Sequence, residues 1–319
     1  MPHPEPRRLL LTGASSGIGL EAARQLAARG HQLTILCRDQ ARADHTLQAL
    51  SGAAQTLICD LADLDAVTAT IAKLLERSRP LDALVLNAGL QYSGERQPRW
   101  STQGIELTFA VNQLAHQVIA TCLLPLLSAA PSPRVVITAS DVHNPASGGG
   151  RVGKPAGLGD LSGLHQGTGF ALLDGSTVFD GDKAYKDSKL CNVLLARELN
   201  RKLEGAIPVM AWSPGLVIAR DSGGFFRYSR QQNPLGMAAF AFVARDLLRL
   251  TESLPRAGAL LVELCLDDGL ATPGFSYHSN HLVRPGLHRF ERVDTSAEAA
   301  DLAKAAALWN GSQALLASL

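Results

Sequence analysis

The stretch LLLTGASSGIGLEAARQLA, residues 9 to 27, decides the fold of this 319-residue chain. A short apolar run leads into a glycine-rich turn, and an amphipathic helical pattern follows it. Glycines between a strand and a helix let the backbone turn tightly and approach a pyrophosphate, which then lies at the positive end of the helix. A merely tight turn is the alternative, but this context favours dinucleotide binding. The predicted binding residues are Gly13, Ser15, Ser16, Gly17, Ile18 and Gly19.

Apolar runs and amphipathic segments continue to alternate along the chain, which predicts βα units and a parallel sheet. The predicted strands are RLLLT (8 to 12), QLTILC (32 to 37), TLIC (56 to 59), DALVLN (82 to 87), RVVITAS (134 to 140), IPVMAW (207 to 212) and GALLVEL (258 to 264). The predicted helices cover about 17 to 29, 63 to 77, 102 to 127 with a bend near Pro125, and 183 to 202. We therefore predict an α/β fold with a doubly wound, Rossmann-type parallel sheet of seven strands. It forms a single domain over residues 8–319, after an N-terminal tail of residues 1–7.

Three segments do not fit the regular alternation. Residues 144–182 hold eleven glycines without a clear period, which indicates an inserted lid or binding loop, with a floppy surface insertion as the alternative. Residues 215–250 are aromatic-rich and predict either an apolar substrate lid or the packed core of a helix pair. Their large apolar residues are Phe225, Phe226, Tyr228, Met237, Phe240 and Phe242. Residues 296–316 predict an Ala-rich C-terminal helix.

Composition excludes several classes of protein. With 46% hydrophobic residues, 18% charged residues and a net charge of +1, the chain lacks the basic surface that nucleic-acid binding requires. No apolar stretch is long enough for a signal peptide or an integral membrane segment, so we expect a cytoplasmic protein. The five cysteines are odd in number and lack C-x-x-C spacing, which argues against disulfides and against a metal site.

The end of the second predicted strand bears on the choice of nicotinamide cofactor. A carboxylate there would accept a hydrogen bond from a free ribose 2′-hydroxyl, whereas a cation suits a 2′-phosphate. Arg38 offers a planar donor fork, and Ser15 adds a hydroxyl, so the sequence favours NADP(H) over NAD(H). A shift of the strand end by one residue would instead bring Asp39 to the ribose. Further cofactor contacts are expected where the next two strands end, at Asp60, Leu61, Asn87, Ala88 and Gly89.

Several motifs occur in a fixed order along the chain. They are TGASSGIG (12 to 19), Asp60, NAG (87 to 89), Asn112, Ser140, Tyr185-x-x-x-Lys189 and Ser213-Pro214-Gly215. In this order and context the chain resembles the short-chain dehydrogenases/reductases over residues 8 to 266. The resemblance implies catalysis by Asn112, Ser140, Tyr185 and Lys189. It also implies cofactor contacts from Tyr185, Lys189, Pro214 and Gly215, and a water held by Asn112 in a proton relay.

The chemistry of these residue types agrees with the resemblance. A phenol has a pKa of about 10, and a neighbouring ammonium favours the phenolate, so we expect Lys189 to lower the pKa of Tyr185 from one helical turn away. Ser140 ends a predicted strand and can hydrogen-bond a substrate oxygen whose charge changes during hydride transfer. Taken singly, each residue has an ordinary structural explanation, but their joint occurrence at the ends of one sheet favours catalysis.

Ser140 and Tyr185 are 45 positions apart, because the glycine-rich segment lies between them. GLGDLSGL (157 to 164) and FDGDKAYKDSKLCN (179 to 192) resemble the light-dependent protochlorophyllide oxidoreductases, which share this insertion. The chain departs from them at Leu216, where they carry a cysteine, and at LNAG (86 to 89), where they tend to have Cys-Asn-Ala-Ala. These departures favour another apolar carbonyl or alcohol as the substrate.

The sequence thus predicts an NADP(H)-dependent oxidoreductase that acts on a hydrophobic small molecule. The alternatives are light-dependent reduction of protochlorophyllide and a catalytically silent NADP(H)-binding sensor. The resemblance leaves both a homo-oligomer and a monomer open, because pairing through two long helices is common in the family while members with insertions can be monomers.

Overall fold

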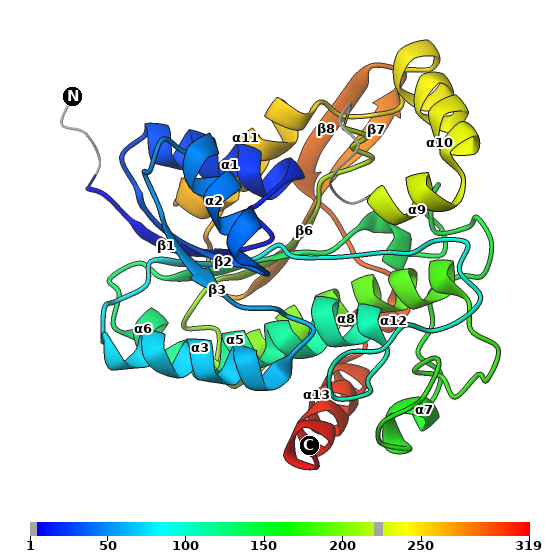
Figure 1. Ribbon diagram of the computed structural model, residues 1–319, viewed down its shortest axis with the longest axis horizontal. Coiled ribbons are helices and arrows are strands. Elements are labelled where there is room, and N and C mark those ends of the chain that lie inside the picture. Colours follow the sequence, from blue (N-terminus) through cyan, green and yellow to red (C-terminus); the bar gives the residue numbers. More distant parts are fainter. Residues whose placement is uncertain (1–4, 220–225) are drawn as a thin grey trace.

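A computed structural model describes residues 5–219 and 226–319 of the chain, which form a sheet covered by helices on both faces (Figure 1). The sheet has eight strands in the order β3-β2-β1-β4-β5-β6-β7-β8. The strands β1 to β7 pair in parallel, and β8 pairs antiparallel with β7. Their bounds are β1 Arg8–Thr12, β2 Gln32–Cys37, β3 Gln55–Ile58, β4 Ala83–Leu86, β5 Arg134–Thr138, β6 Val209–Ser213, β7 Phe275–Arg284 and β8 Leu287–Arg292. The chain reverses its direction across the sheet between β1 and β4, where open sheets of this kind bind ligands.

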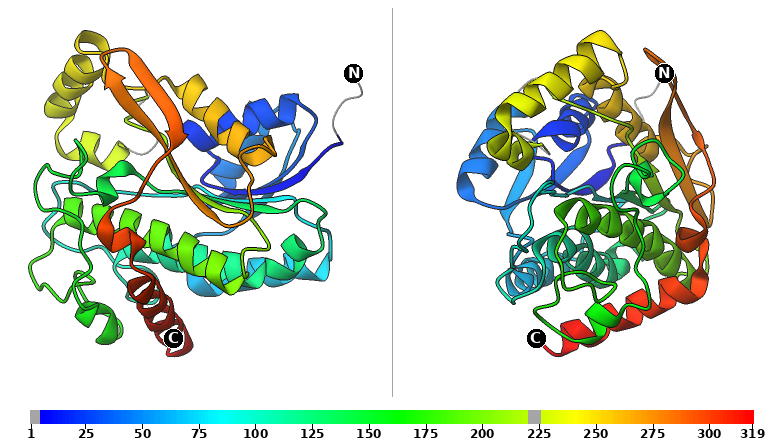
Figure 2. Two further views of the ribbon diagram at one scale, coloured as in Figure 1. Left: turned by 180° about the vertical axis from the view of Figure 1, so that it is seen from behind. Right: turned by 90° about the vertical axis from the view of Figure 1, so that its right-hand side faces the viewer.

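Two layers of helices cover the sheet (Figures 1 and 2). One layer contains α1 (Gly17–Ala28), α2 (Gln40–Ala49) and α11 (Leu254–Leu266), and the other contains α3 (Leu64–Glu76), α5 (Ala115–Cys122) and α8 (Gly181–Lys202). Side chains of a strand point alternately to the two faces, so Leu9 and Leu11 pack under the first layer and Leu10 under the second. This burial on both faces explains the nearly continuous apolar runs of the strands.

The seventh predicted strand was wrong. GALLVEL (258 to 264) lies within helix α11, which begins after the N-cap Ser253 with Pro255 in its first turn and packs against α1. A short apolar run does not by itself distinguish a strand from a buried helix. The strand after β6 is instead β7, whose polar sequence FSYHSNH is buried in the sheet, and the hairpin to β8 adds an eighth strand.

The helix predicted over 102 to 127 is broken into shorter pieces. It comprises α4 (Leu107–Phe109), a π-helical turn η1 (Ala110–Leu114), α5, and α6 (Leu124–Ser128), with the break before Pro125 as expected. A π-helical turn interrupts the regular ladder of backbone hydrogen bonds and is often found at functional sites. Asn112 lies in the middle of this turn.

The glycine-rich insertion is a packed part of the structure, so the floppy alternative was wrong. It follows the short helix η2 (Asp141–His143), contains the short helix α7 (Ser162–His165), and buries Leu158, Leu161 and Phe170 in the main core. The C-terminal helix predicted over 296–316 is split into α12 (Ala297–Ala300) and α13 (Leu302–Ala317), and α13 packs against α8 and α7.

The described residues of the segment 215–250 include α9 (Arg227–Gln232), α10 (Pro234–Ala241) and the π-helical turn η3 (Phe242–Leu247). Helix α10 has no buried residue, which rules out the packed helix pair. Phe225 lies outside the described residues. Among the described residues, no helix is both long enough and apolar enough to span a membrane.

Candidate active site

A large cavity opens at the carboxyl ends of the central strands. Its volume is about 1630 Å³, which exceeds the roughly 300–1,000 Å³ of a pocket for one drug-sized ligand. It therefore has room for a dinucleotide together with a second molecule. The cavity is lined by every predicted cofactor-binding residue and by the candidate catalytic residues Ser140, Tyr185 and Lys189. Asn112 is fully buried behind the wall.

The glycine-rich turn forms a cradle for an anion. Gly13 has a φ of +65°, and a side chain there would place a Cβ 2.5 Å from Cα of Ala88, so only glycine fits. The N-cap of α1, Ser16, makes no side-chain hydrogen bond to the helix, whereas α2 and α3 are capped by Asp39 and Asp63. The first backbone N–H groups of α1 are thus left to a ligand, and the helix dipole favours a negatively charged one. This arrangement fits the pyrophosphate of a dinucleotide.

Three charged residues follow β2, and the carboxylate among them contacts a helix while the two arginines face the cavity. Asp39 accepts a hydrogen bond from the backbone N of Arg42 at 2.9 Å and so caps α2, and it does not line the cavity. Arg38 and Arg42 do line it. Arg42 was missed in the sequence, because it lies one helical turn beyond the strand end and only the fold brings it beside Arg38.

Hydrogen bonds join the ends of neighbouring strands behind the cavity wall. The side-chain nitrogen of Asn87 donates to the Gly13 carbonyl oxygen at 3.1 Å, and its oxygen accepts from the Thr138 hydroxyl at 3.0 Å. Trp212 Nε1 donates to the same hydroxyl at 2.9 Å. Asn87 therefore links β1, β4 and β5 rather than merely making a turn.

Tyr185 lies on the first turns of α8, and both it and Ser140, which follows the end of β5 by two residues, line the cavity. Burial raises the pKa of Tyr185 above its usual value, and the nearby Ser140 hydroxyl only partly opposes this. The expectation that Lys189 lowers the pKa of Tyr185 was wrong, because burial of the phenol raises it. The phenol keeps its proton at neutral pH, which is the form that can donate a proton.

Lys189 lies one turn further along α8, with its Nζ buried at the back of the site. It donates to the Thr138 carbonyl oxygen at 2.8 Å and to Asn192 Oδ1 at 3.2 Å. Asn192 Nδ2 in turn donates to the backbone oxygen of Asn112 at 2.6 Å. Burial lowers the pKa of Lys189 to about 7. The carboxamide of Asn192 therefore connects the lysine directly to the π-helical turn.

The side chain of Asn112 itself fixes the loop after β4. Its Oδ1 accepts from the Leu90 backbone N at 2.9 Å, and its Nδ2 donates to the Leu90 carbonyl oxygen at 3.0 Å and to Ser188 Oγ at 2.9 Å. It thus ties that loop to α8, which carries Tyr185 and Lys189.

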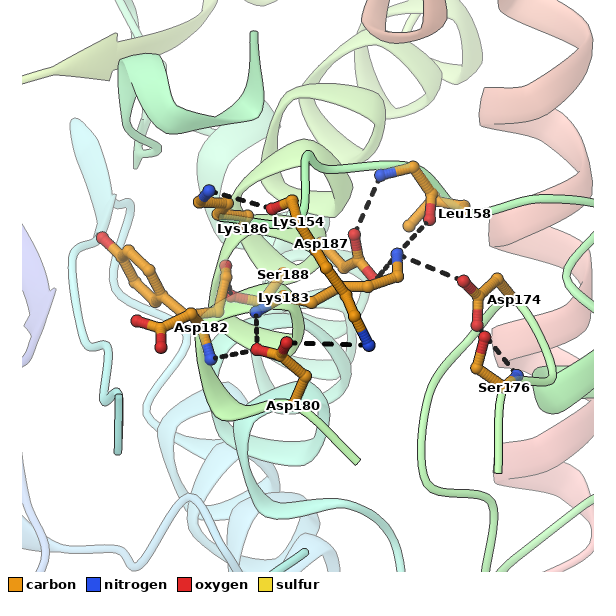
Figure 3. Close-up of polar contacts among 12 residues, drawn as sticks. Lys154, Leu158, Asp174, Ser176, Asp180, Asp182, Lys183, Lys186, Asp187 and Ser188 are labelled. Atoms are coloured by element: carbon orange, nitrogen blue, oxygen red, sulfur yellow. Dashed lines mark hydrogen bonds and ion pairs between the residues drawn. The ribbon is translucent and has the colours of Figure 1, made fainter. Parts of the chain in front are cut away.

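Two further lysines of α8 hold the glycine-rich insertion (Figure 3). Lys186 Nζ donates to the carbonyl oxygens of Gly150, Val152 and Lys154, which lie on the loop that lines the cavity. Lys183 Nζ donates to Asp187 Oδ2 at 2.8 Å and lies 3.2 Å from Asp174 Oδ2. The insertion is therefore fastened to the helix that carries Tyr185.

A polar cluster next to Ser140 was also missed in the sequence. Tyr277 and Ser279 on β7 donate from their hydroxyls to the carboxylate of Asp141, at 2.9 and 2.8 Å, and all three line the cavity. The wrong assignment of the seventh strand hid these two β7 residues. In the described part of the chain, all five cysteines are free thiols, and no cluster of three His, Cys, Asp or Glu side chains could hold a metal ion.

Comparison with known proteins agrees with this geometry. The family model described as short chain dehydrogenase matches residues 7–150. Protochlorophyllide reductase A, chloroplastic, of Oryza sativa subsp. japonica is 35% identical over 97% of this chain and 80% of the rice protein. The chain belongs to the short-chain dehydrogenase/reductase family. Within the family it lies in the protochlorophyllide reductase-like branch, since protochlorophyllide reductase of Avena sativa is also similar, with 33% identity over 97% of this chain and 99% of that protein.

Solved structures of short-chain dehydrogenases/reductases share this fold. Levodione reductase superposes with a TM-score of 0.63 and 20% identity over 88% of this chain and 96% of that chain. Pseudomonas aeruginosa RhlG in its NADP active-site complex gives 0.62 and 24% identity over 86% of this chain and 94% of that chain. Membership in the family makes this protein an oxidoreductase that uses a nicotinamide cofactor and acts on a small molecule.

Proposed function

We propose that the protein is an NADP(H)-dependent oxidoreductase that interconverts a hydrophobic carbonyl compound and its alcohol. The observation that carries this proposal is that Ser140, Tyr185 and Lys189 line one cavity, which also contains the uncapped start of α1. A proton donor and an anion cradle thus share one cavity.

Two arginines support NADP(H) as the cofactor. Arg38 and Arg42 line the cavity at the end of β2, and the nearby Asp39 caps α2. A 2′-phosphate would meet two guanidinium groups there, whereas a free 2′-hydroxyl would find no carboxylate from Asp39. Ser15 and Ser16 line the same part of the turn and add hydroxyl donors.

The bound cofactor supplies or accepts the hydride, and the protein handles the proton. In the reductive direction Ser140 hydrogen-bonds the substrate oxygen, and Tyr185 gives its phenolic proton to that oxygen as negative charge develops on it. The ammonium of Lys189 stabilises the phenolate that remains. Asn112 holds α8 and the loop after β4 at a fixed position relative to each other, because its side chain hydrogen-bonds both Leu90 and Ser188.

The rest of the cavity favours an apolar substrate. Residues 215–250 contribute several apolar side chains to its wall, and we assign this segment the role of a substrate lid. The lining residues from it are Leu216, Val217, Ala219, Phe226, Tyr228, Phe240 and Leu250. Val152 of the insertion lines the same cavity and is 69% exposed. An exposed apolar side chain on a cavity wall is suited to contact with a ligand.

A second candidate reaction is the light-dependent reduction of protochlorophyllide. The names of the relatives in rice and oat favour it, and the same Tyr185 would donate the proton. Against it stands Leu216, which lines the cavity at the position where the pigment reductases carry a cysteine.

Purified protein mixed with NADPH and a panel of apolar ketones and aldehydes tests the proposal, with loss of NADPH absorbance as the readout. We expect turnover in the dark that Tyr185→Phe abolishes, while this variant still binds NADPH. Chlorophyllide absorbance that appears only when protein, NADPH and protochlorophyllide are illuminated would favour the second reaction instead. Binding of NADPH without turnover in either assay would favour a catalytically silent sensor, and absence of NADPH binding would overturn all three.

A further inference from the structure

Asn192 occupies a buried position between two parts of the candidate active site. Its side chain is 1% exposed, and it bridges Lys189 Nζ and the backbone oxygen of Asn112 at 3.2 and 2.6 Å. Helix α8 supplies both Asn192 and Lys189, whereas Asn112 belongs to the π-helical turn η1.

We propose that Asn192 is a positioning residue of the active site, which holds the ammonium of Lys189 in place beneath Tyr185 by a fixed carboxamide bridge to the Asn112 carbonyl. This inference rests on the proposed function, because it gives Asn192 a part in the action of the catalytic tyrosine and lysine.

The two groups that Asn192 joins, an ammonium and a backbone carbonyl, require a side chain with the hydrogen-bonding capacity of a carboxamide. An ammonium has only donors and a backbone carbonyl only accepts, so a side chain between them must accept at one end and donate at the other. Asparagine does both, and its two partners fix the orientation of the amide. A carboxylate would face the carbonyl with a second acceptor, and an apolar side chain would leave both buried groups without a partner, which is costly in a protein interior.

The hydrogen bond to Asn192 also limits how many N–H groups Lys189 can offer to a ligand. Two of its three N–H groups are held by the Thr138 carbonyl and by Asn192, which leaves one for the cavity. A side chain at position 89 would place its Cβ 3.5 Å from Lys189 Nζ, so the loop after β4 closes another side of the lysine. A carboxamide holds the ammonium but does not pass protons on as a water would, and the role of Asn192 is therefore positioning.

Two titratable groups face Lys189 from the elements around it. Tyr185 is on the same helix, and its ring centroid lies 5.8 Å from Lys189 Nζ. His116 is on α5, its Nε2 lies 3.1 Å from the Thr12 hydroxyl, and burial together with the charge of Lys189 lowers its pKa to about 3. His116 is therefore neutral throughout the range of an ordinary assay, and its titration does not obscure that of Lys189.

Asn192→Leu and Asn192→Asp, two variants of similar volume, test the proposal, and Asn200→Leu on the same helix is the matched control. Asn192→Leu removes the acceptor from Lys189, so we expect kcat to fall about 10- to 100-fold, as for a lost hydrogen bond to a charged group, with KM for NADPH nearly unchanged. The pH above which kcat/KM declines, as Lys189 loses its proton, should become lower. Asn192→Asp should raise it, because a carboxylate favours the ammonium. Asn200→Leu should leave the profile in place.

A titration that needs no substrate separates this proposal from the proposed function. In protein labelled with ¹⁵N in its lysine side chains, Lys189 is assigned by loss of its signal in Lys189→Met. We expect its pKa to be lower in Asn192→Leu and higher in Asn192→Asp than in the wild type. An identical pKa in all three proteins, or a wild-type profile and kcat in Asn192→Leu, would overturn the bridge. If the wild type turns over no substrate, the proposed function fails, while this titration still decides whether Asn192 controls the lysine.

Discussion

Lys189 and Thr138 are joined by a hydrogen bond of 2.8 Å from the lysine Nζ to the threonine carbonyl oxygen. Thr138 is the last residue of β5, and Ser140 follows it two positions later. The bond therefore fixes the lysine of α8 to the strand that carries the serine. Ser140 and Tyr185 line the same cavity as Lys189, so the helix and the strand together place the three side chains on one wall.

The first prediction concerns the pH dependence of turnover. Burial lowers the pKa of Lys189 to about 7 from its ordinary value near 10.5, so the lysine is charged below about pH 7 and loses its proton above it. Because the charged form stabilises the phenolate, we expect kcat/KM for ketone reduction to decline as the pH rises through about 7. Tyr185 does not produce this decline, because its own pKa is raised.

Lys189→Arg is the control for this decline of kcat/KM above about pH 7, which we call the alkaline limb. A guanidinium stays charged at all assay pH values. We expect this variant to lose most of its activity, since a planar group does not fit the site of an ammonium, and to lose the limb as well. A limb that stays near pH 7 in Lys189→Arg would show that another group titrates there.

The second prediction concerns cofactor choice. Arg42 lines the cavity, and its backbone N is fixed by Asp39. If its guanidinium meets a 2′-phosphate, Arg42→Ala should weaken NADPH binding by about ten-fold or more and leave NADH binding almost unchanged, because charge-assisted hydrogen bonds are worth about 1.5–3 kcal/mol. Fluorescence titration of both reduced cofactors measures this. Arg29→Ala, at the exposed far end of α1, is the control. Equal losses for both cofactors would contradict recognition of the phosphate.

The sequence predicted the parts of the site that depend on local chemistry. Gly13 is required by a positive φ and a close approach to Ala88, and such a requirement is visible as a glycine between a strand and a helix. Ser140 follows β5 by two residues, and Tyr185 and Lys189 lie in the first half of α8, close to where the alternation of strands and helices placed them. All of them line one cavity in the structure.

The missed features depend on contacts between distant parts of the chain. In the sequence Asn192 is an ordinary polar residue of a helix, and its contact with the Asn112 carbonyl is formed only when η1 packs against α8. The pKa of Tyr185 depends on burial, which the i, i+4 spacing to Lys189 does not reveal. β7 was missed because its buried face carries Ser and His rather than aliphatic residues, and α11 was mistaken for a strand because its run of apolar residues packs against α1.

The third prediction concerns the hydrogen bonds that hold the glycine-rich insertion against α8. Lys186 is buried and gives its three N–H groups to the carbonyl oxygens of Gly150, Val152 and Lys154. Lys186→Met keeps the length of the side chain but removes these donors, so the loop should open more often. We expect faster cleavage by trypsin after the exposed Arg151 and a several-fold higher KM for the substrate, with NADPH binding retained.

Lys183→Met is the companion variant, because Lys183 contacts Gly157 and Asp174 rather than the loop around Val152. It should not accelerate cleavage after Arg151 to the same extent. Equal cleavage rates in Lys186→Met and wild type would show that the three carbonyl contacts do not hold the loop.

The fourth prediction concerns the oligomeric state. Helix α13 crosses and packs against α8 (Figure 2), and Gln117 of α5 donates to the backbone oxygen of Trp309 at 3.3 Å. The chain's own C-terminal helix therefore occupies part of the surface of α8, one of the two long helices through which family members often pair. We expect a monomer of 33.8 kDa in size-exclusion chromatography with light scattering, at every concentration tested.

The same packing makes α13 important for stability. Trp309 is 6% exposed, and Lys202 of α8 lies over its ring, 5.0 Å from Nζ to the centroid. Trp309→Ala should lower the free energy of unfolding by about 3–5 kcal/mol, measured by urea denaturation, because it leaves a cavity under α13. Leu302→Ala, at a position that is 56% exposed, should change it by about 0.5 kcal/mol or less. A wild-type dimer that Trp309→Ala dissociates would instead place Trp309 at a contact between subunits.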